Sequence, residues 1–541
     1  MNWIRRSSWL VALLPAIAAF TYVWAAARYP EPVAGRVALH EPTTVWYIDQ
    51  WLDTTGEPLQ PLQRGLLLGA LEVPGATLQL VVVLAALAAV LIAWFGSRLV
   101  RSSVAVEGWS GPLAFGGIAL LCCSPSFGAD WLQAERVGMF APPLLLLGAL
   151  LLLQRERFFV WRMLAVLMLV AAAPLFHDAG VLLGVALIPA VLGAAGRAEA
   201  PRWLWAITTL VFGVVASLVS FYPAGGLHGD EVGLFAHLAA APGARVLDLL
   251  AAVGRGWLDL WPDRRIGELA LGAATLTLLA VLPFVPPREG ARSAASWWSC
   301  AIFGVLLVPW VTMRHGFDLS PWLGRELHYG LFLLPLGVLG LLASRAGNHA
   351  WSIGLGALAV LAAQDWPRGA EDLRAARAEA IRVEASLALP PAFADHTVVS
   401  LSPFASAMHR DRLLGRGWVP DPTFDCEAAA KAAQASPPRD ELGNVISGSP
   451  IDLHGMVRSA IVHEQVGAVL VAAVHDDRFE LLGATLPRFV GRSRDAQWRV
   501  SWGTAVAEGT KLVAFAYLPR QRSVVRIGGV RLVKDGALTS L

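Results

Sequence analysis

Lysine is almost absent from this chain of 541 residues: only Lys431, Lys511 and Lys534 occur. Catalysis or phosphate binding by lysine is therefore excluded from the first 365 residues, where arginine or histidine must supply any cation. The four cysteines form no disulfide framework. Charged residues make up only 16% of the chain and the formal net charge is +2, so the composition does not favour a nucleic-acid partner.

The chain instead contains many long apolar runs. Hydrophobic residues make up 56% of the chain, and about 20 of them in a row can cross the roughly 30 Å hydrocarbon core of a bilayer. Residues 366–541 contain no such run. We expect about 11 transmembrane helices, near residues 8–27, 78–97, 109–127, 138–154, 162–176, 179–195, 203–222, 269–286, 297–313, 329–344 and 350–364.

These runs predict an α-helical polytopic membrane domain over residues 1–365 and a soluble C-terminal α/β domain over residues 366–541. Leu59–Val73, in the first long loop, has the apolar spacing of an amphipathic helix on a membrane surface. The second long loop has the same character. The three loops expected on the outer side cover residues 28–77, 223–268 and 314–329.

The arginines predict the orientation. Arg5 and Arg6 precede the first run, and the short loops that alternate with the outer loops all carry arginine, as the positive-inside rule requires of cytoplasmic segments. With the N-terminus in the cytoplasm, an odd number of spans places the C-terminal domain outside. The excess of arginine over lysine and the lack of eukaryotic targeting signals favour a bacterial inner membrane, with a periplasmic C-terminal domain.

The C-terminal domain reads as a mixture of helices and strands. Residues 368–387 have the charge spacing of an exposed helix. Gly528-Gly529 is expected to form a turn or bulge. We expect strands at Thr397–Leu401, Ala468–Val474, Trp498–Trp502, Lys511–Tyr517 and Ser523–Val533, and helices near 427–435 and 455–464.

Ionisable residues of the membrane half gather toward its outer face, whereas the interiors of the spans are nearly free of charge. A pump or channel usually carries ionisable groups in mid-span, so this pattern favours chemistry at one surface. His177-Asp178 also marks a break between two runs, because charge is costly at the bilayer centre. The outer residues are Asp49, Asp53, Arg136, His177, Asp178, Arg325 and Glu326.

Four segments carry a resemblance to a known family. YIDQWLDTTGEPLQPLQRGLLLGALEVPGATLQ resembles an acidic pair followed by Arg-Pro-Leu, with Asp49 on the acidic position and Gln60-Pro61-Leu62 on Arg-Pro-Leu. WLQAERVGMFAPPLLLLGALLLL places Arg136 on an arginine that precedes a span. FHDAGVLLGVALIPAVL takes the place of a Ser-Lys-Glu-like turn, and GRELHYGLFLLPLGVLGLL resembles Arg-Tyr-Leu-Pro, with Arg325 and Tyr329 on its polar positions.

In this order, over residues 8–345, the segments resemble GT-C-type glycosyltransferases, which use lipid-phosphate-linked sugars. The local match is nearest to the branch of protein O-mannosyltransferases with tetratricopeptide repeats and their bacterial relatives. The C-terminal domain is not covered. Gln50, Gln60 and the missing lysine depart from the family pattern.

The resemblance implies sugar transfer from a polyprenyl-phosphate donor to a glycan, lipid or protein acceptor among membrane lipids. Asp49 is the expected base, and Asp53 is expected to replace the missing second acid. Arg136, Arg325 and His177 are expected to bind the donor phosphate, with Asp178, Glu326 and Tyr329 in support. No motif indicates a metal or another cofactor, although a divalent metal would also stabilise the departing phosphate.

Two other classes of function are also consistent with the sequence. The departures from the motifs also fit a non-catalytic membrane protein on the same scaffold, and a polytopic chain can be a lipid or solute transporter. Some of the predicted site residues also have simpler structural roles. Arg136 and Arg325 can anchor helices at the lipid headgroups, and His177-Asp178 can serve only to separate two spans.

Overall fold

The structure is a computed structural model that divides into two compact units, one with the described helices up to Ala370 and one with the described residues from Glu371 onward. The first unit is mostly helical and the second is a β-sheet region. The described residues are 2–26, 61–63, 65–66, 79–103, 110–124, 134–154, 160–195, 202–221, 242–258, 265–286, 294–315, 330, 332–346, short pieces between 351 and 389, 425–458, 466–475, 478–487 and 495–540.

The helices of the first unit follow the apolar runs of the sequence. Among the described residues, three segments are long and apolar enough to cross a bilayer: Val83–Ser102, Ile266–Phe284 and Ala294–Val311. The other apolar helices are shorter over their described lengths. The helices, with 3-10 helices marked η, are α1 (Asn2–Ala26), α5 (Gln79–Ser103), α6 (Ser110–Cys122), η3 (Ala134–Phe140), α8 (Ala141–Leu153), α9 (Val160–Phe176), η4 (Asp178–Val181), α10 (Leu182–Ala186), α11 (Ile188–Ala195), α12 (Arg202–Phe221), α14 (Pro242–Leu258), α15 (Arg265–Val281), η5 (Leu282–Phe284), α16 (Ala294–His315) and α19 (Leu333–Ala346).

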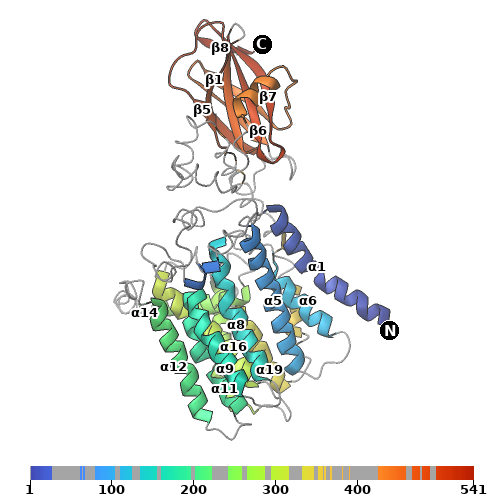
Figure 1. The fold of residues 1–541 in the computed structure, drawn as a ribbon, viewed down its shortest axis with the longest axis vertical. Helices are drawn as coiled ribbons and strands as arrows, with labels where there is room; N and C mark the ends of the chain where they lie inside the picture. Colours follow the sequence, from blue (N-terminus) through green and yellow to red (C-terminus); the bar gives the residue numbers. More distant parts are fainter. Residues whose placement is uncertain are drawn as a thin grey trace. The chain divides into compact units, whose positions relative to one another are not determined.

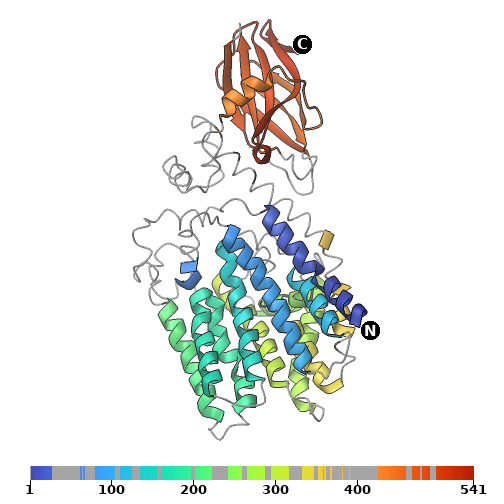
Figure 2. The same cartoon turned by 45° about the vertical axis from the view of Figure 1, so that its right-hand side comes forward.

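Helix α12 has one packed face and one uncovered face. It lies beside α9 and α11 in the bundle (Figures 1 and 2). On the packed face, a methyl group on Gly213 would lie 3.1 Å from the Cα of Gly184 in α10, so the two backbones nearly touch. On the other face, Trp203, Ile207 and Leu218 stay exposed. A row of large exposed apolar side chains fits contact with lipid better than contact with water.

Three hydroxyl groups of α12 bond within their own helix. Thr208 and Thr209 each donate to the carbonyl four residues earlier at 2.8 Å, and Ser217 donates to the Gly213 carbonyl at 2.6 Å. Such back-bonding satisfies the hydroxyl donor without water. The helices can therefore carry these residues in apolar surroundings at little cost.

Both segments predicted as amphipathic helices are helical where the structure describes them. Within Leu59–Val73, residues 61–63 and 65–66 are helical, and Gln63 is buried. In the second long loop, α14 packs against α15, buries Val253 and leaves Val246 exposed.

The described part of the second unit consists mainly of two antiparallel sheets, with the helix α23 (Cys426–Ala433) and the 3-10 helix η6 (Pro519–Gln521). The strand orders are β1-β2-β5 and β4-β3-β6-β7-β8. Helix α23 begins after Asp425, whose carboxylate accepts from the amides of Glu427 and Ala428 at 2.9 and 3.0 Å. The strands are β1 (Gly443–Ser449), β2 (Asp452–Arg458), β3 (Ala468–His475), β4 (Arg478–Thr485), β5 (Asp495–Ser501), β6 (Lys511–Leu518), β7 (Ser523–Lys534) and β8 (Ala537–Ser540).

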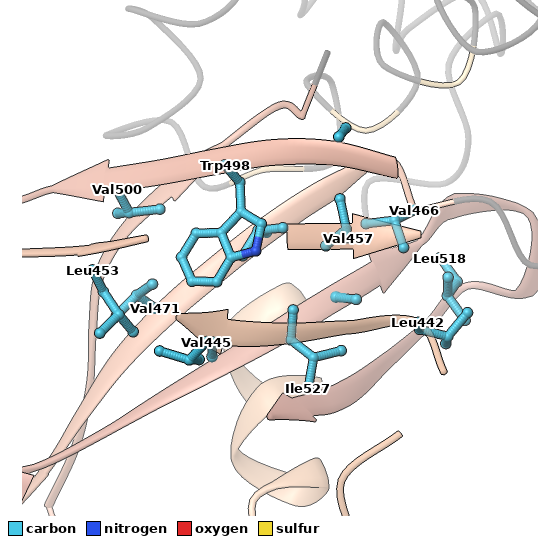
Figure 3. Packing of buried hydrophobic residues seen from close by; sticks show 14 residues of the cluster. Leu442, Val445, Leu453, Val457, Val466, Val471, Trp498, Val500, Leu518 and Ile527 are labelled. Carbon is cyan, nitrogen blue, oxygen red and sulfur yellow. The ribbon is translucent and has the colours of Figure 1, made fainter. Parts of the chain in front are cut away.

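The five-stranded sheet is covered on both faces. Trp498 of β5 points between the two sheets, into a cluster with Leu453 and Ile527 (Figure 3). On the opposite face, Phe515 of β6 belongs to a second cluster with Ala430 of α23. Strand β3 reads as an almost unbroken apolar run because both its faces are covered, whereas β5 alternates because one of its faces is exposed.

Four of the five predicted strands are confirmed in position by β3, β5, β6 and β7, and α23 confirms the helix near 427–435. The helix predicted near 455–464 is wrong over its described part, because residues 455–458 belong to β2 and pair with β5. Strands β1, β4 and β8 were not predicted. Thr397–Leu401 lies outside the described residues, and the α/β character of the whole domain stays a prediction.

The bulge predicted at Gly528-Gly529 is confirmed. The pairing of β6 with β7 shifts register between Leu512 and Ala514. Opposite this shift, Gly528 has a φ of 65°, in the left-handed region that favours glycine.

The hairpin between β1 and β2 is held by the carboxylate of Asp452. It accepts from the amide of Ser449 at 3.1 Å and from its hydroxyl at 2.6 Å, and it also pairs with the Arg499 guanidinium across the sheet. The hydrogen bond from the Ser449 hydroxyl and then the one from Arg499 hold the pKa of the Asp452 carboxyl below its ordinary value. The ionised carboxylate therefore stabilises the folded hairpin.

We expect Asp452→Asn to loosen this hairpin by about 1 kcal/mol at neutral pH, discounted for the exposure of Arg499. Because the pKa is lowered on folding, the stabilisation is complete above the ordinary aspartate pKa of about 3.9 and is lost as pH falls through the lower folded value. Hydrogen exchange of the β1–β2 amides should therefore differ between variant and wild type near neutral pH and converge in acid. Asp440→Asn, in an exposed turn, is the matched control; an equal effect there would contradict this role.

Candidate functional site

The site begins where α9 ends. The amide of His177 donates to the Ala173 carbonyl at 3.1 Å, and His177 then adopts extended backbone with φ −159° and ψ 141°. This conformation stops α9 at Phe176, and η4 begins at Asp178. The predicted break between the two apolar runs is confirmed.

Gly180 lets the chain fold back on α9. Its amide donates to the His177 carbonyl at 2.8 Å. A methyl group on Gly180 would overlap the carbonyl of Ala173 and the nitrogen of Pro174, so only glycine fits without a shift of backbone. Since η4 also packs against α8, α10, α12 and α16, the turn is held from several sides.

His177 and Asp178 form a close pair in this turn. The His177 Nδ1 lies 2.8 Å from the Asp178 Oδ1, and the two side chains are 26% and 7% exposed. The amide of Ala179 donates to the same Oδ1 at 2.6 Å. A nearly buried carboxylate thus lies against an imidazole that solvent still reaches.

The geometry favours one arrangement of protons on the ring. The Ala179 amide lies 3.2 Å from the His177 Nδ1 but closer to the carboxylate, which is the stronger acceptor. Nδ1–H then donates to Asp178, and Nε2 is left as the acceptor of a neutral ring. Such a ring can take a proton from a hydroxyl, or in its protonated form stabilise a phosphate.

Three segments that are far apart in sequence meet at Gly138 of η3. A methyl group on Gly138 would overlap the Phe176 carbonyl oxygen and lie 2.6 Å from the Oε1 of Gln63. Gln63 is only 3% exposed. Phe176 directly precedes His177, and Gly138 follows Arg136 by two residues. The described helical piece of the first long loop, η3 and the α9–η4 turn are therefore in contact.

The structure describes only some of the predicted site residues. His177 and Asp178 are described with their side chains, and the backbone of Arg136 lies in η3. The contact at Gly138 brings η3 to the α9–η4 turn. Asp49, Asp53, Arg325, Glu326 and Tyr329 lie outside the described residues. The roles of all the predicted site residues stay predictions.

Sequence reasoning missed Gln63, Gly138 and Gly180. Each lies one to three residues from a motif position: Gln63 follows Gln60-Pro61-Leu62, Gly138 follows Arg136, and Gly180 follows His177-Asp178. A glycine or glutamine at such a place carries no signal of its own. The close approaches at Gly138 join it to Gln63 and to Phe176, which lie in other segments of the chain, whereas the one at Gly180 is with Ala173 and Pro174 at the end of the preceding helix.

No group of three histidine, cysteine, aspartate or glutamate side chains lies close enough to hold a metal ion in the described ranges. Binding of a divalent metal by the predicted acids Asp49 and Asp53 stays a prediction, because both residues lie outside those ranges.

The chain matches no protein-family model, no curated protein and no solved structure.

We expect Gly180→Ala to destabilise the first unit by about 1–3 kcal/mol, because the added methyl group must displace backbone rather than a flexible side chain. A fall in the thermal unfolding midpoint of the detergent-solubilised protein measures this. The control is Gly117→Ala in α6, where a methyl group would lie 3.8 Å from the nearest atom, the Leu355 carbonyl oxygen. Equal midpoints for the two variants would show that the turn tolerates a side chain.

Proposed function

We propose that this chain is an integral membrane glycosyltransferase of GT-C type, which transfers a sugar from a polyprenyl-phosphate donor to an acceptor on the extracytoplasmic face. The observation that supports this most is the meeting at Gly138. It joins three of the four segments that carry the resemblance: the loop with Gln60-Pro61-Leu62, the arginine segment of η3 and the His177-Asp178 turn.

The proposed chemistry assigns a task to each group. Asp49, assisted by Asp53, orients and deprotonates the acceptor hydroxyl. Arg136 and Arg325 contact the donor phosphate, because a guanidinium can donate two parallel hydrogen bonds to phosphate oxygens. His177, oriented by Asp178 at 2.8 Å, supplies a further donor to the departing phosphate when its ring is protonated on both nitrogens. Glu326 and Tyr329 support this site, and the C-terminal domain helps to bind the acceptor.

The proposal includes about 11 spans with the N-terminus in the cytoplasm. Some helices outside the three span candidates also support this number of spans, although their described lengths are shorter. The exposed apolar face of α12 runs from Trp203 to Leu218, which is about 24 Å at a rise of about 1.5 Å per residue. Arg345 also fits, since it donates to the carbonyls of Leu282 and Val285 at one end of the bundle, where a cytoplasmic arginine is expected.

Single-cysteine labelling tests this topology. In a background without the four native cysteines, we expect a membrane-impermeant maleimide added to intact spheroplasts to label Ser447→Cys in the exposed part of β1. We expect it to leave Arg101→Cys at the end of α5 unlabelled until the membrane is opened, because an odd number of spans separates the two positions. Labelling of both or of neither in intact spheroplasts would overturn the orientation.

Two observations bear on the alternatives. Among the three described span candidates, ionisable residues lie only near the ends, as Arg98, Arg101 and Glu268, which does not favour a transporter with a mid-membrane ion site. The non-catalytic alternative is favoured by Gln50 and Gln60, which replace charged residues of the family pattern.

We expect reconstituted wild-type protein to transfer sugar from a labelled polyprenyl-phosphate donor, and Asp49→Asn to lose about 100-fold or more of this activity. His177→Asn should lose about tenfold or more, because it removes a donor to the leaving phosphate. Radiolabel in the acceptor fraction measures both.

His475→Asn, at the exposed end of β3, is the control and should keep full activity. Equal activity of Asp49→Asn and wild type would remove Asp49 from the reaction. Wild type that binds polyprenyl phosphate but transfers no sugar from any donor would favour the non-catalytic scaffold.

A further inference from the structure

We infer that Gln63 and Gly138 are positioning residues of this site: the buried carboxamide of Gln63, seated on the bare Cα of Gly138, sets where η3 lies relative to the His177-Asp178 turn. The inference rests on the proposed function for its chemistry. The contact between the three segments does not depend on that function.

The first support is the burial of Gln63. A glutamine side chain exposed to only 3% loses its water, so its oxygen and nitrogen must bond inside the protein. Such a residue holds its neighbours in fixed places, because each of its hydrogen bonds has a direction. A solvated residue of an amphipathic surface helix would not be placed in this way.

The second support is the closeness of the packing at Gly138. An added Cβ would meet the Oε1 of Gln63 at 2.6 Å, its Cδ at 2.8 Å and the Phe176 carbonyl oxygen closer still. The Gln63 side chain and the Phe176 backbone thus share the space that a side chain at position 138 would fill. A change in any one of the three moves the other two.

The third support is what these residues adjoin. Gly138 stands two residues after Arg136 on the short 3-10 helix η3, and Phe176 is covalently joined to His177. A shift of η3 against the turn changes the separation of the two groups proposed to hold the donor phosphate. A misplacement of about 1 Å in a catalytic constellation can lower the rate about 100-fold. Gln63 therefore acts on the reaction through Arg136 and His177, without touching substrate.

The test uses full-length protein in lipid nanodiscs and four variants. Gln63→Glu keeps the length of the side chain but replaces the amide donor, and Gln63→Asn shortens it by one methylene. Gly138→Ala fills the contact. Gly148→Ala in α8 is the matched control, because a methyl group there would meet only side-chain atoms at 3.6 and 3.9 Å.

Two readouts are needed: sugar transfer, and binding of unglycosylated polyprenyl phosphate. We expect Gln63→Glu and Gln63→Asn to lower kcat about 10- to 100-fold and to weaken the binding of unglycosylated polyprenyl phosphate about threefold or more, because the groups that shift contact the phosphate. Both should keep the wild-type unfolding midpoint within a few degrees. Gly138→Ala should show the same loss of kcat, and its effect should be non-additive with that of Gln63→Glu, because both act on one contact. Gly148→Ala should match wild type.

The outcomes separate the two claims. If wild type transfers sugar and both Gln63 variants keep its kcat, the inference fails and the proposed function stands. If wild type binds polyprenyl phosphate without transferring sugar, the proposed function fails, and the inference then requires weaker binding in the Gln63 variants than in Gly148→Ala. Equal binding in all variants overturns it. A fall in kcat that follows the unfolding midpoint across the variants also overturns it, because that would be a loss of folded protein.

Discussion

The helical unit depends on one constraint: a polar group buried among apolar side chains is costly when it has no hydrogen-bond partner. Hydroxyl groups along the helices bond to their own backbone, as Thr208, Thr209 and Ser217 do. A helix end has no such partner for its last carbonyls, so polar contacts between segments gather there. The α9 end is one of these places, where the Phe176 carbonyl, the Gln63 carboxamide and the His177-Asp178 pair lie together.

In the β-sheet unit, charged groups lie on a sheet face that solvent reaches. Its central sheet has apolar contacts on both faces, whereas the outer face of the β1-β2-β5 sheet carries ion pairs such as Arg458 with Asp495 and Arg499 with Asp452. Such exposed pairs contribute little stability. They fit a solvated surface, and the burial of Trp498 and Phe515 holds the unit together.

The sequence predicts the elements whose pattern is set locally and misses those set by distant partners. The helices follow from their apolar runs, and β3 and β6 from theirs, because coverage on both faces leaves a continuous signal. Strand β2, DLHGMVR, is short and carries Gly455, so its alternation is too weak to distinguish it from the helix expected near 455–464. Strand β1 has no clear strand pattern because glycine and serine dominate it. The break at His177 could be predicted from the cost of charge. The contact of Gln63 with Gly138 could not, because nothing near either residue in the sequence indicates it.

Two of the three departures from the family pattern offset each other in charge. On the proposed correspondence, Gln50 removes one negative charge and Gln60 removes one positive charge from the same loop, so its net charge is unchanged. The lysine of the third motif gives way to His177, which comes with its own carboxylate, Asp178, at 2.8 Å. In the proposed site, the loss of this lysine places the demand for a cation on Arg136, Arg325 and His177, which lies against the Asp178 carboxylate.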